Sequence, residues 1–165
     1  MSGSAAHGEQ AAGPRVIVLG PGEGRIIPGP EGLTLKASSE ETGGSIGVLE
    51  GTSPPGSGGP RHIHHRADEL FYVLGGEFLF LVGERFVSAP PGTFVFIPRG
   101  TVHAPKCLGP EPGRVLAAFV PGGVERAFEE FAELARRQGS ALARSGVEAR
   151  AIDEKYHSEV VGPPL

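Results

Sequence analysis

The sequence predicts an all-β fold, a sandwich or barrel of short strands with a helical extension at its C-terminal end. Short runs of β-branched and aromatic residues recur along most of the chain, and clusters such as "GPGEG" and "TSPPGSGGP" separate them. Glycine and proline between such runs are typical of all-β domains. The pattern changes to helical spacing only after residue 121, so the helices are expected to follow the β domain.

Eleven runs are the candidate strands. They follow one another at roughly even spacing, as the strands of sandwiches and barrels do. They cover residues 15–19, 25–28, 33–37, 45–50, 61–65, 69–75, 77–82, 85–89, 93–98, 101–105 and 114–120.

Two segments with glycine, "VLGGEF" and "LVGERF", are interpreted as hairpin turns, because glycine supplies the positive φ that two-residue loops need. Nearly every residue from 70 to 82 is apolar, so both faces of these strands are expected to be buried. One face would line a barrel interior. The other would be covered by a second subunit, giving a homodimer, or by the C-terminal segment.

A helix is predicted over residues 122–139. Its acidic residues come early and its arginines late, which suits the helix dipole, and Gly139 is a suitable end. Four apolar residues recur at helical spacing and form its buried stripe: Val124, Phe128, Phe131 and Ala135.

A second, shorter helix is expected to start at Ser145, where Glu148 would complete a capping box. Ile152 and Tyr156 would share its buried side. The tail "EVVGPPL" is expected to be extended. The resulting organisation is a disordered N-terminal tail (1–13), a β-barrel domain (14–121) and a helical C-terminal extension (122–165).

Composition excludes several classes of protein. The 165 residues suit one domain, and a formal net charge of −4 gives no basic footprint for nucleic acid. Cys107 is the only cysteine, so no disulfide framework exists and the cytoplasm is the expected location. No secretory signal is expected from the N-terminal residues, and no apolar run approaches the roughly 20 residues that a membrane helix needs.

Three histidines crowd the four positions from 62 to 65. Successive residues on a strand point to opposite faces, so His62 and His64 share one face while Ile63 and His65 share the other. Two imidazoles spaced in this way can converge on one metal ion. His65 is expected at the surface or behind the site.

Glu69 opens the next candidate strand, five residues after His64. A tight bend between them would bring its carboxylate beside the two histidines, and alternation places Phe71 and Val73 on the same face as Glu69. A carboxylate at the head of an apolar face is costly to bury unless it is paired or bound to metal.

His103 lies 34 residues beyond Glu69, after a turn at residues 98–100 between two candidate strands. An antiparallel neighbour could deliver it to the same pocket. Three imidazoles and one carboxylate suit Fe(II), Mn, Co, Ni, Cu or Zn, and do not suit Ca or a closed structural zinc site. Such a donor set would leave positions open for water, O2 or substrate.

These residues belong to two motifs that resemble those of the cupin superfamily. The first motif, G(X)5HXH(X)3–4E(X)6G, is matched by Gly56, His62, His64, Glu69 and Gly76. The second motif, G(X)5PXG(X)2H(X)3N, is matched by Gly92, Pro98, Gly100 and His103, with Cys107 where asparagine is usual. The resemblance covers roughly residues 33–120.

The resemblance implies a jelly-roll β-barrel. It also implies that one divalent transition metal ion is bound by His62, His64, Glu69 and His103. More narrowly, "HIHHRADELFYVLGGEF", "FVFIPRGTVHA" and the C-terminal "EKYHSEVVGPPL" are similar to small single-domain quercetin dioxygenase-like cupins.

Three functions remain open at this point. The first is an oxygenase acting on a small aromatic or enolisable substrate, with Glu69 as the catalytic base. The second is a non-redox isomerase, lyase or polyketide-type cyclase, in which the metal is a Lewis acid. The third is a cupin that binds a small molecule without catalysis. None of them calls for a nucleic acid or a membrane as partner.

The other candidate residues carry less information. Cys107 lies four residues beyond His103 and would share its face on a regular strand, but a buried inert thiol is favoured over a ligand or redox thiol. His7 and His157 are expected to be solvated. Five phenylalanines are expected to be mostly core: Phe71, Phe78, Phe80, Phe94 and Phe96.

Overall fold

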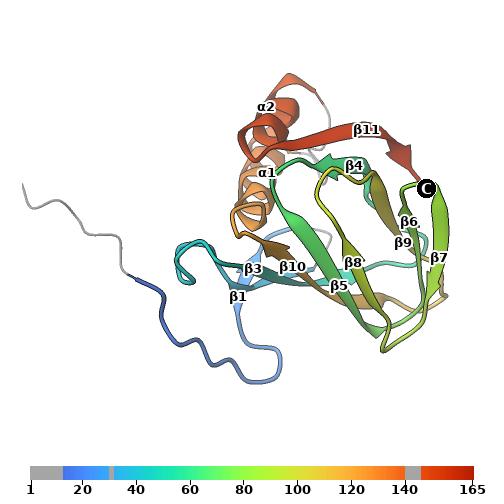
Figure 1. Cartoon of the computed structure of the whole chain (residues 1–165), viewed down its shortest axis with the longest axis horizontal. Coiled ribbons are helices and arrows are strands. Elements are labelled where there is room, and N and C mark those ends of the chain that lie inside the picture. Colours follow the sequence, from blue (N-terminus) through green and yellow to red (C-terminus); the bar gives the residue numbers. More distant parts are fainter. Residues whose placement is uncertain (1–12, 30–31, 140–145) are drawn as a thin grey trace, which may run out of the picture.

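The computed structural model describes residues 13–29, 32–139 and 146–165, which form two antiparallel β-sheets and two helices (Figure 1). The strands are β1 (Arg25–Ile27), β2 (Leu33–Ala37), β3 (Gly47–Ser53), β4 (Pro60–His64), β5 (Asp68–Gly75), β6 (Phe78–Val82), β7 (Arg85–Ala89), β8 (Phe94–Ile97), β9 (His103–Cys107), β10 (Gly113–Val120) and β11 (Ser158–Pro164). The helices are α1 (Glu125–Gln138) and α2 (Val147–Lys155).

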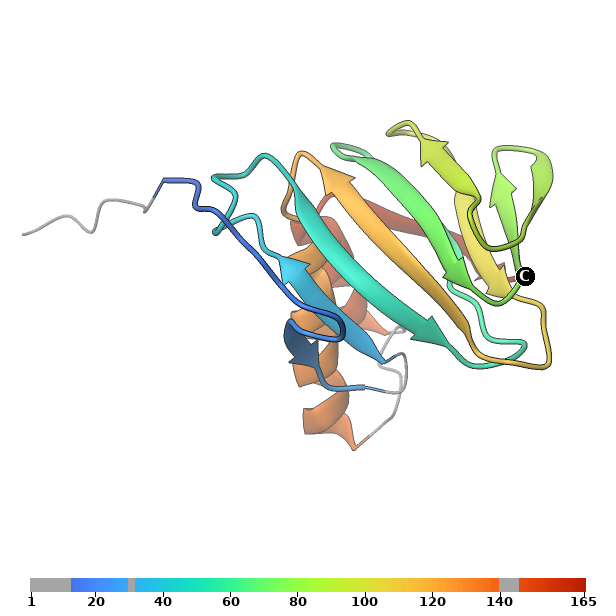
Figure 2. The ribbon, with the colours of Figure 1, turned by 90° about the horizontal axis from the view of Figure 1, so that it is seen from below.

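The two sheets face each other and enclose the interior of the molecule (Figure 2). The first sheet has the strand order β1-β2-β3-β10-β5-β8, and the second has the order β11-β4-β9-β6-β7. Strands that neighbour each other in a sheet are often distant in the sequence, as in a jelly roll. The predicted all-β fold with a C-terminal helical region is confirmed.

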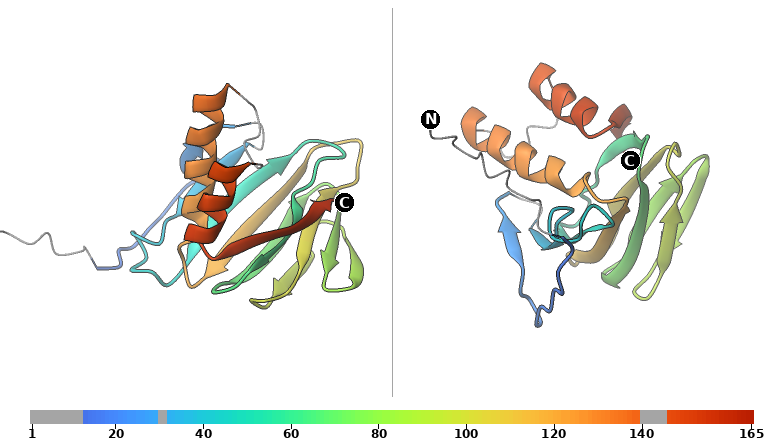
Figure 3. Two further views of the ribbon diagram at one scale, coloured as in Figure 1. Left: turned by 90° about the horizontal axis from the view of Figure 1, so that it is seen from above. Right: turned by 60° about the vertical axis from the view of Figure 1, so that its left-hand side comes forward.

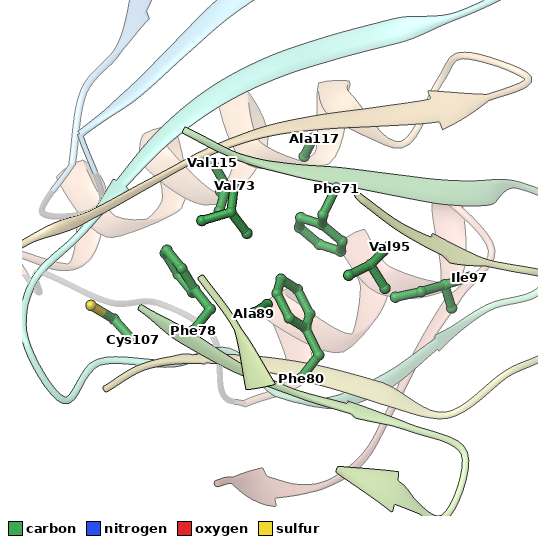
Figure 4. Close-up of a cluster of buried hydrophobic side chains, with 10 residues drawn as sticks. All are labelled: Phe71, Val73, Phe78, Phe80, Ala89, Val95, Ile97, Cys107, Val115 and Ala117. Atoms are coloured by element: carbon green, nitrogen blue, oxygen red, sulfur yellow. The ribbon is translucent and has the colours of Figure 1, made fainter. Parts of the chain in front are cut away.

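The main hydrophobic core lies between the sheets (Figure 4). It takes inward-facing residues from both sheets, as strand alternation requires. Its buried members are Phe71, Val73, Phe78, Phe80, Ala89, Val95, Ile97, Cys107, Val115 and Ala117. Phe71 and Phe80 come from opposite sheets and their ring centroids lie 5.0 Å apart, so the aromatic side chains fix the spacing of the sheets at this end.

One of the two predicted hairpins is wrong. β5 pairs with β10 and β8, whereas β6 pairs with β7 and β9, so "VLGGEF" is a corner that carries the chain from one sheet to the other. Gly76 has φ +70° there, and a Cβ on it would lie 2.6 Å from the Cα of Gly113. The other prediction is confirmed, because Val82 pairs with Arg85 across "LVGERF".

The predicted strand at 15–19 is also wrong. Val16 and Val18 are 92% and 86% exposed, and no strand of the described residues pairs with this segment. Its backbone is held at Arg15, whose N–H donates to the carbonyl of Glu41 over 3.0 Å. A β-branched run becomes a strand where a neighbour completes the hydrogen-bond ladder, and here the neighbour is missing.

The predicted first helix is confirmed as α1, with Gly139 in the left-handed conformation at its end (φ 61°). Helix α2 begins at Val147 without a side-chain cap, and its predicted N-cap, Ser145, lies outside the described residues. Residues 1–12 of the predicted N-terminal tail also lie outside them. The extended C-terminal tail is confirmed and forms β11, which pairs with β4.

The two helices connect the sheets. Helix α1 packs against β1 and β3 of the first sheet, and α2 packs against α1 and against β11 of the second sheet (Figure 3). The fully buried carboxylate of Glu125 anchors the start of α1, since it accepts hydrogen bonds from the N–H groups of Ser39 (2.7 Å) and Gly123 (2.6 Å). In the described part of the chain, neither helix has the length and apolar character that crossing a membrane requires.

The outer face of β5 and β8 is exposed. Alternation puts Tyr72 and Leu74 of β5 outward beside Phe94 and Phe96 of β8, and the two phenylalanines are 59% and 49% exposed. These two are the exceptions to the expectation that the five phenylalanines are mostly core, which holds for Phe71, Phe78 and Phe80. The C-terminal segment does not cover this face, because β11 lies at the edge of the second sheet.

Candidate metal centre

Three strands from the two sheets of the barrel bring the predicted site residues together. His62 and His64 lie on β4 and both point inward, and antiparallel pairing places His103 of β9 directly opposite His62. Glu69 comes from β5 in the other sheet, after the bend at residues 65–67. Its carboxylate therefore reaches the three imidazoles from across the barrel interior.

The four side chains form a compact cluster. Each offers one ligand atom, and these atoms all lie within 4.8 Å of one another. Glu69 Oε2 lies 2.7 Å from Nε2 of His103 and 3.3 Å from Nε2 of His64. The His62 and His103 rings have centroids 4.1 Å apart. Because His64, Glu69 and His103 are buried, the cluster faces the barrel interior and is largely shielded from bulk water.

Backbone carbonyls fix two of the rings. Nδ1 of His62 lies 2.8 Å from the carbonyl oxygen of Pro60, and Nδ1 of His103 lies 2.9 Å from that of Thr101. A carbonyl only accepts hydrogen bonds, so each Nδ1 carries the proton and donates. Nε2 of each ring therefore faces the cluster, and Nε2 of His103 lies 2.7 Å from Oε2 of Glu69. A neutral ring in this orientation offers the lone pair of Nε2 to a metal ion.

The electrostatics of the cluster favour a cation. Burial, followed by the neighbouring His103 and His64, lowers the pKa of His62 to about 3, so this ring is neutral at physiological pH. Burial raises the pKa of Glu69, but the hydrogen bonds from His103 and His64 outweigh it and hold that pKa below its usual range. Burial lowers the pKa of His103, but the Glu69 carboxylate outweighs it and raises that pKa.

The cluster could bind a divalent metal ion. Ligand atoms about 2.1 Å from a shared ion are at most about 4.2 Å apart, so the widest separation here would need to contract by about half an ångström. Three imidazole nitrogens and one carboxylate oxygen suit transition metals better than calcium or magnesium, which prefer oxygen ligands.

A cavity of about 470 Å³ opens beside the cluster. His62, His64 and Glu69 lie in its wall, which is otherwise mostly apolar. Five phenylalanines contribute to that wall: Phe71, Phe78, Phe119, Phe128 and Phe131. The last two come from α1, so the helical extension completes the cavity that the barrel begins. The volume is in the usual range for a small-molecule site.

The remaining sequence candidates lie away from the ligand cluster. His65 is exposed and pairs with Glu159 over 2.9 Å, as its outward orientation predicts. His157 is exposed, and His7 lies outside the described residues. Cys107 is fully buried and lines the cavity, with Sγ 3.7 Å from the carbonyl of Glu111, but it is not one of the four clustered donors.

Two residues have roles near the site that the sequence analysis does not predict. Ser158 of β11 places its Oγ 2.8 Å from Nδ1 of His64, and the buried carboxylate of Glu125 ties α1 to the loop before β3. Glu125 stands in no motif, and the similarity of the C-terminal "EKYHSEVVGPPL" to other cupins assigns no role to Ser158. The pairing of β11 with β4 joins positions 94 residues apart, and no local pattern marks it.

The fold and the inward-facing histidine and glutamate cluster define a cupin. The Cupin domain family model matches residues 49–119, which run from β3 to β10 and include all four clustered residues. This part of the chain is a cupin domain.

Similar proteins agree with this assignment. Quercetin 2,3-dioxygenase of Bacillus subtilis is 28% identical over 117 residues, which are 70% of this chain and 34% of the relative. Germin-like protein 3-8 of Oryza sativa is 32% identical over 138 residues, 73% of this chain and 60% of the relative. The chain thus spans only about a third of the length of the Bacillus enzyme.

Solved structures show the same fold. An RmlC-like cupin from Shewanella frigidimarina superposes with a TM-score of 0.54 at 21% identity, over 66% of this chain and 92% of that one. The two chains therefore share a barrel, and the chemistry of this chain has to be argued from its own site.

Proposed function

We propose that the protein is a metal-dependent oxygenase acting on a small aromatic or enolisable compound that binds in the barrel. The proposed metal ligands are His62, His64, Glu69 and His103, with Glu69 also serving as base. The observation that carries this proposal is the position of the cluster, because His62, His64 and Glu69 line a mostly apolar cavity of about 470 Å³.

A bound Fe, Mn, Ni, Cu, Co or Zn ion would supply a Lewis acid and, for the redox-active metals, the means to activate O2. The three imidazoles would hold the ion in their neutral form. Glu69 lies in the cavity wall and would accept the proton of a substrate hydroxyl bound within hydrogen-bond reach of its carboxylate. The surrounding phenylalanines would exclude water from the reacting groups.

The cavity wall supports an uncharged or weakly acidic substrate. No lysine or arginine lies among the described residues that line it. A dicarboxylate or phosphate would lose its hydration there without gaining a cationic partner from the protein, which is unfavourable. Phe119 packs edge-on against His64 with ring centroids 5.5 Å apart, so an aromatic surface lies beside the proposed ligands. The name of the Bacillus relative points to the same kind of substrate, a flavonol.

The test is O2 consumption by protein loaded with Fe(II), Mn or Ni, in the presence of flavonols, catechols or β-diketones. We expect uptake with at least one metal and substrate pair. Glu69→Gln should lower kcat by about 100-fold or more, since a positioned general base contributes about 10²–10⁴. Glu77→Gln is the matched control, because this glutamate is exposed at the corner after β5.

No O2 uptake with any of these metals would contradict the oxygenase proposal. Full turnover of a substrate without O2 in the zinc-loaded protein would favour an isomerase, lyase or cyclase instead. Tight binding of the same compounds without turnover, unchanged in Glu69→Gln, would favour a binding protein.

We also propose a homodimer that forms through the outer aromatic patch, defined as Tyr72, Leu74, Phe94 and Phe96. These side chains are adjacent, because Tyr72 pairs with Phe94 across β5 and β8. The C-terminal strand β11 lies in the other sheet, and residues 1–12 contain no Phe, Tyr, Trp, Val, Leu or Ile. A second copy supplies an equally apolar and self-complementary surface, as two-fold dimers require.

Sedimentation velocity tests the dimer. The wild type should sediment as a dimer at micromolar concentration, and Phe94→Glu should sediment as a monomer because it buries a charge in the interface. Phe86→Glu is the control, since Phe86 is also exposed but lies on β7 in the other sheet. A monomeric wild type, or a Phe94→Glu variant that remains dimeric, would contradict this interface.

A further inference from the structure

The C-terminal strand reaches the proposed metal centre directly. β11 pairs with β4 in antiparallel register, and Ser158 stands opposite His64. Residues directly opposite each other on paired strands direct their side chains to the same face, so both point into the barrel. The Oγ atom of Ser158 lies 2.8 Å from Nδ1 of His64, and both residues line the cavity.

His64 differs in this respect from the other two histidines. The rings of His62 and His103 are oriented by backbone carbonyls two residues before them, so their orientation depends on local chain geometry alone. His64 has a side-chain hydroxyl as partner, and that hydroxyl comes from a strand 94 residues away. The orientation of this ring therefore depends on where β11 lies.

The hydrogen bond determines which nitrogen of His64 faces the cluster. With Nδ1 held against Oγ of Ser158, Nε2 faces Glu69, whose Oε2 is 3.3 Å away. A neutral ring in this orientation offers the lone pair of Nε2 to a metal ion. Partners of this kind behind a metal-binding histidine set its tautomer and ring angle, and removing them typically weakens metal binding by about 10–100-fold.

β11 itself is anchored at both ends. At its start, the N–H of His65 donates to the carbonyl of His157 over 2.8 Å. At its far end, Nζ of Lys106 donates to the carbonyl of Leu165 over 2.8 Å. The strand also supplies Val160 and Pro164 to the cavity wall, so it is part of the site on three counts: backbone pairing, cavity lining and the bond to His64.

We propose that Ser158 is a positioning residue of the metal centre, which orients His64 and couples metal binding to the docking of α2 and β11. The inference rests on the proposed function, since it requires a metal ion at this cluster. The coupling is reciprocal by thermodynamic linkage, so metal binding must also stabilise the docked C-terminal segment.

Co(II) titration against a competing chelator tests the proposal, with the visible spectrum of the bound Co(II) as a report on ligand geometry. Ser158→Ala should weaken Co(II) binding by about 10–100-fold and change the spectrum. Ser158→Thr keeps the hydroxyl and should bind within about threefold of the wild type. Ser57→Ala is the matched control, because Ser57 lines the same cavity but donates to the carbonyl of Pro54.

Hydrogen exchange supplies a second measurement, the effect of Co(II) on amide exchange in β11. If Ser158 only stabilised the fold, its replacement would leave this effect of Co(II) unchanged. In the wild type, Co(II) should slow exchange of the backbone amides of residues 158–162, and in Ser158→Ala it should not. If Ser158→Ala does not fold, Ser158→Val replaces it, since valine has the shape of threonine without the hydroxyl.

Equal Co(II) affinity and an unchanged spectrum in Ser158→Ala would overturn the proposal. Equally weak binding by the threonine and valine variants would also overturn it, because the hydroxyl would then be irrelevant. These outcomes differ from failure of the proposed function, which is indicated if the wild type binds no Co(II) at all.

Discussion

Replacing His62 with alanine is expected to remove tight metal binding and, with it, the proposed oxygenase activity. The ring is neutral at physiological pH and makes one hydrogen bond, to the carbonyl of Pro60, so its removal takes away a ligand without leaving a buried charge unpaired. Three donors would remain. We expect metal affinity to fall by more than the roughly 100-fold that loss of an outer partner of a ligand causes.

Elemental analysis after dialysis measures this directly as the ratio of metal to protein. Thermal unfolding adds an independent measurement. A ligand at 100 times its Kd stabilises the native state by about 2.7 kcal/mol, so the wild type should melt at a higher temperature with metal than without it. The His62→Ala variant should lack this increment at the same metal concentration, while its melting temperature without metal should change little.

His65→Ala is the matched control for His62→Ala. The two histidines lie close together at β4, but His65 is exposed and pairs with Glu159 at the surface. Its removal should leave metal content and the metal-dependent increment in melting temperature unchanged. Full metal content in His62→Ala, or equal losses in the two variants, would contradict the four-residue site.

Replacing Glu125 with alanine is expected to give a large loss of stability. Its carboxylate is fully buried and accepts hydrogen bonds from the backbone N–H groups of Ser39 and Gly123. Alanine would leave both groups without their partner in the protein interior. Hydrogen bonds to charged groups contribute about 1.5–3 kcal/mol each, so we expect a loss of about 3 kcal/mol in the free energy of unfolding.

Thermal or urea unfolding measures this loss, which corresponds to a decrease of roughly 6–12 °C in Tm for a chain of this size. Glu129→Ala is the control on the same helix, because Glu129 forms a surface ion pair with Arg25 that contributes at most about 1 kcal/mol. Gly47→Ala should also destabilise the protein, since its Cβ would overlap the Glu125 carboxylate. Equal effects of the two glutamate variants would contradict the anchoring role of Glu125.

The effects of Gly47→Ala and Glu125→Ala should not add. The first variant destabilises the protein through a clash with the carboxylate that the second removes. The double variant should therefore be more stable than the sum of the single effects predicts, which is the signature of two residues in contact.

Alternation along single strands is the part of the fold that sequence reasoning predicts well. The inward orientation of His62 and His64, the outward orientation of His65, and the shared face of Glu69 with Phe71 all follow from a period of two, and the structure agrees. The helical stripe of α1 and its end at Gly139 follow from equally local rules.

Errors arise where a strand needs a partner that the sequence does not identify. Residues 15–19 have the composition of a strand but no neighbour, and "VLGGEF" has the composition of a hairpin but joins two different sheets. Phe94 and Phe96 are exposed because β8 has a face that nothing in the described chain covers. In each case the local pattern is correct and the missing information is long-range.

The sequence by itself determined the all-β class, the position of the C-terminal helices and the four residues of the candidate site, because periodicity and motif spacing are properties of short segments. Only the tertiary structure decided that β11 pairs with β4, that Ser158 lies behind His64, and that Glu125 anchors α1. The physical reason is that these contacts join residues some 80 to 95 positions apart, and their stability depends on how whole sheets and helices pack.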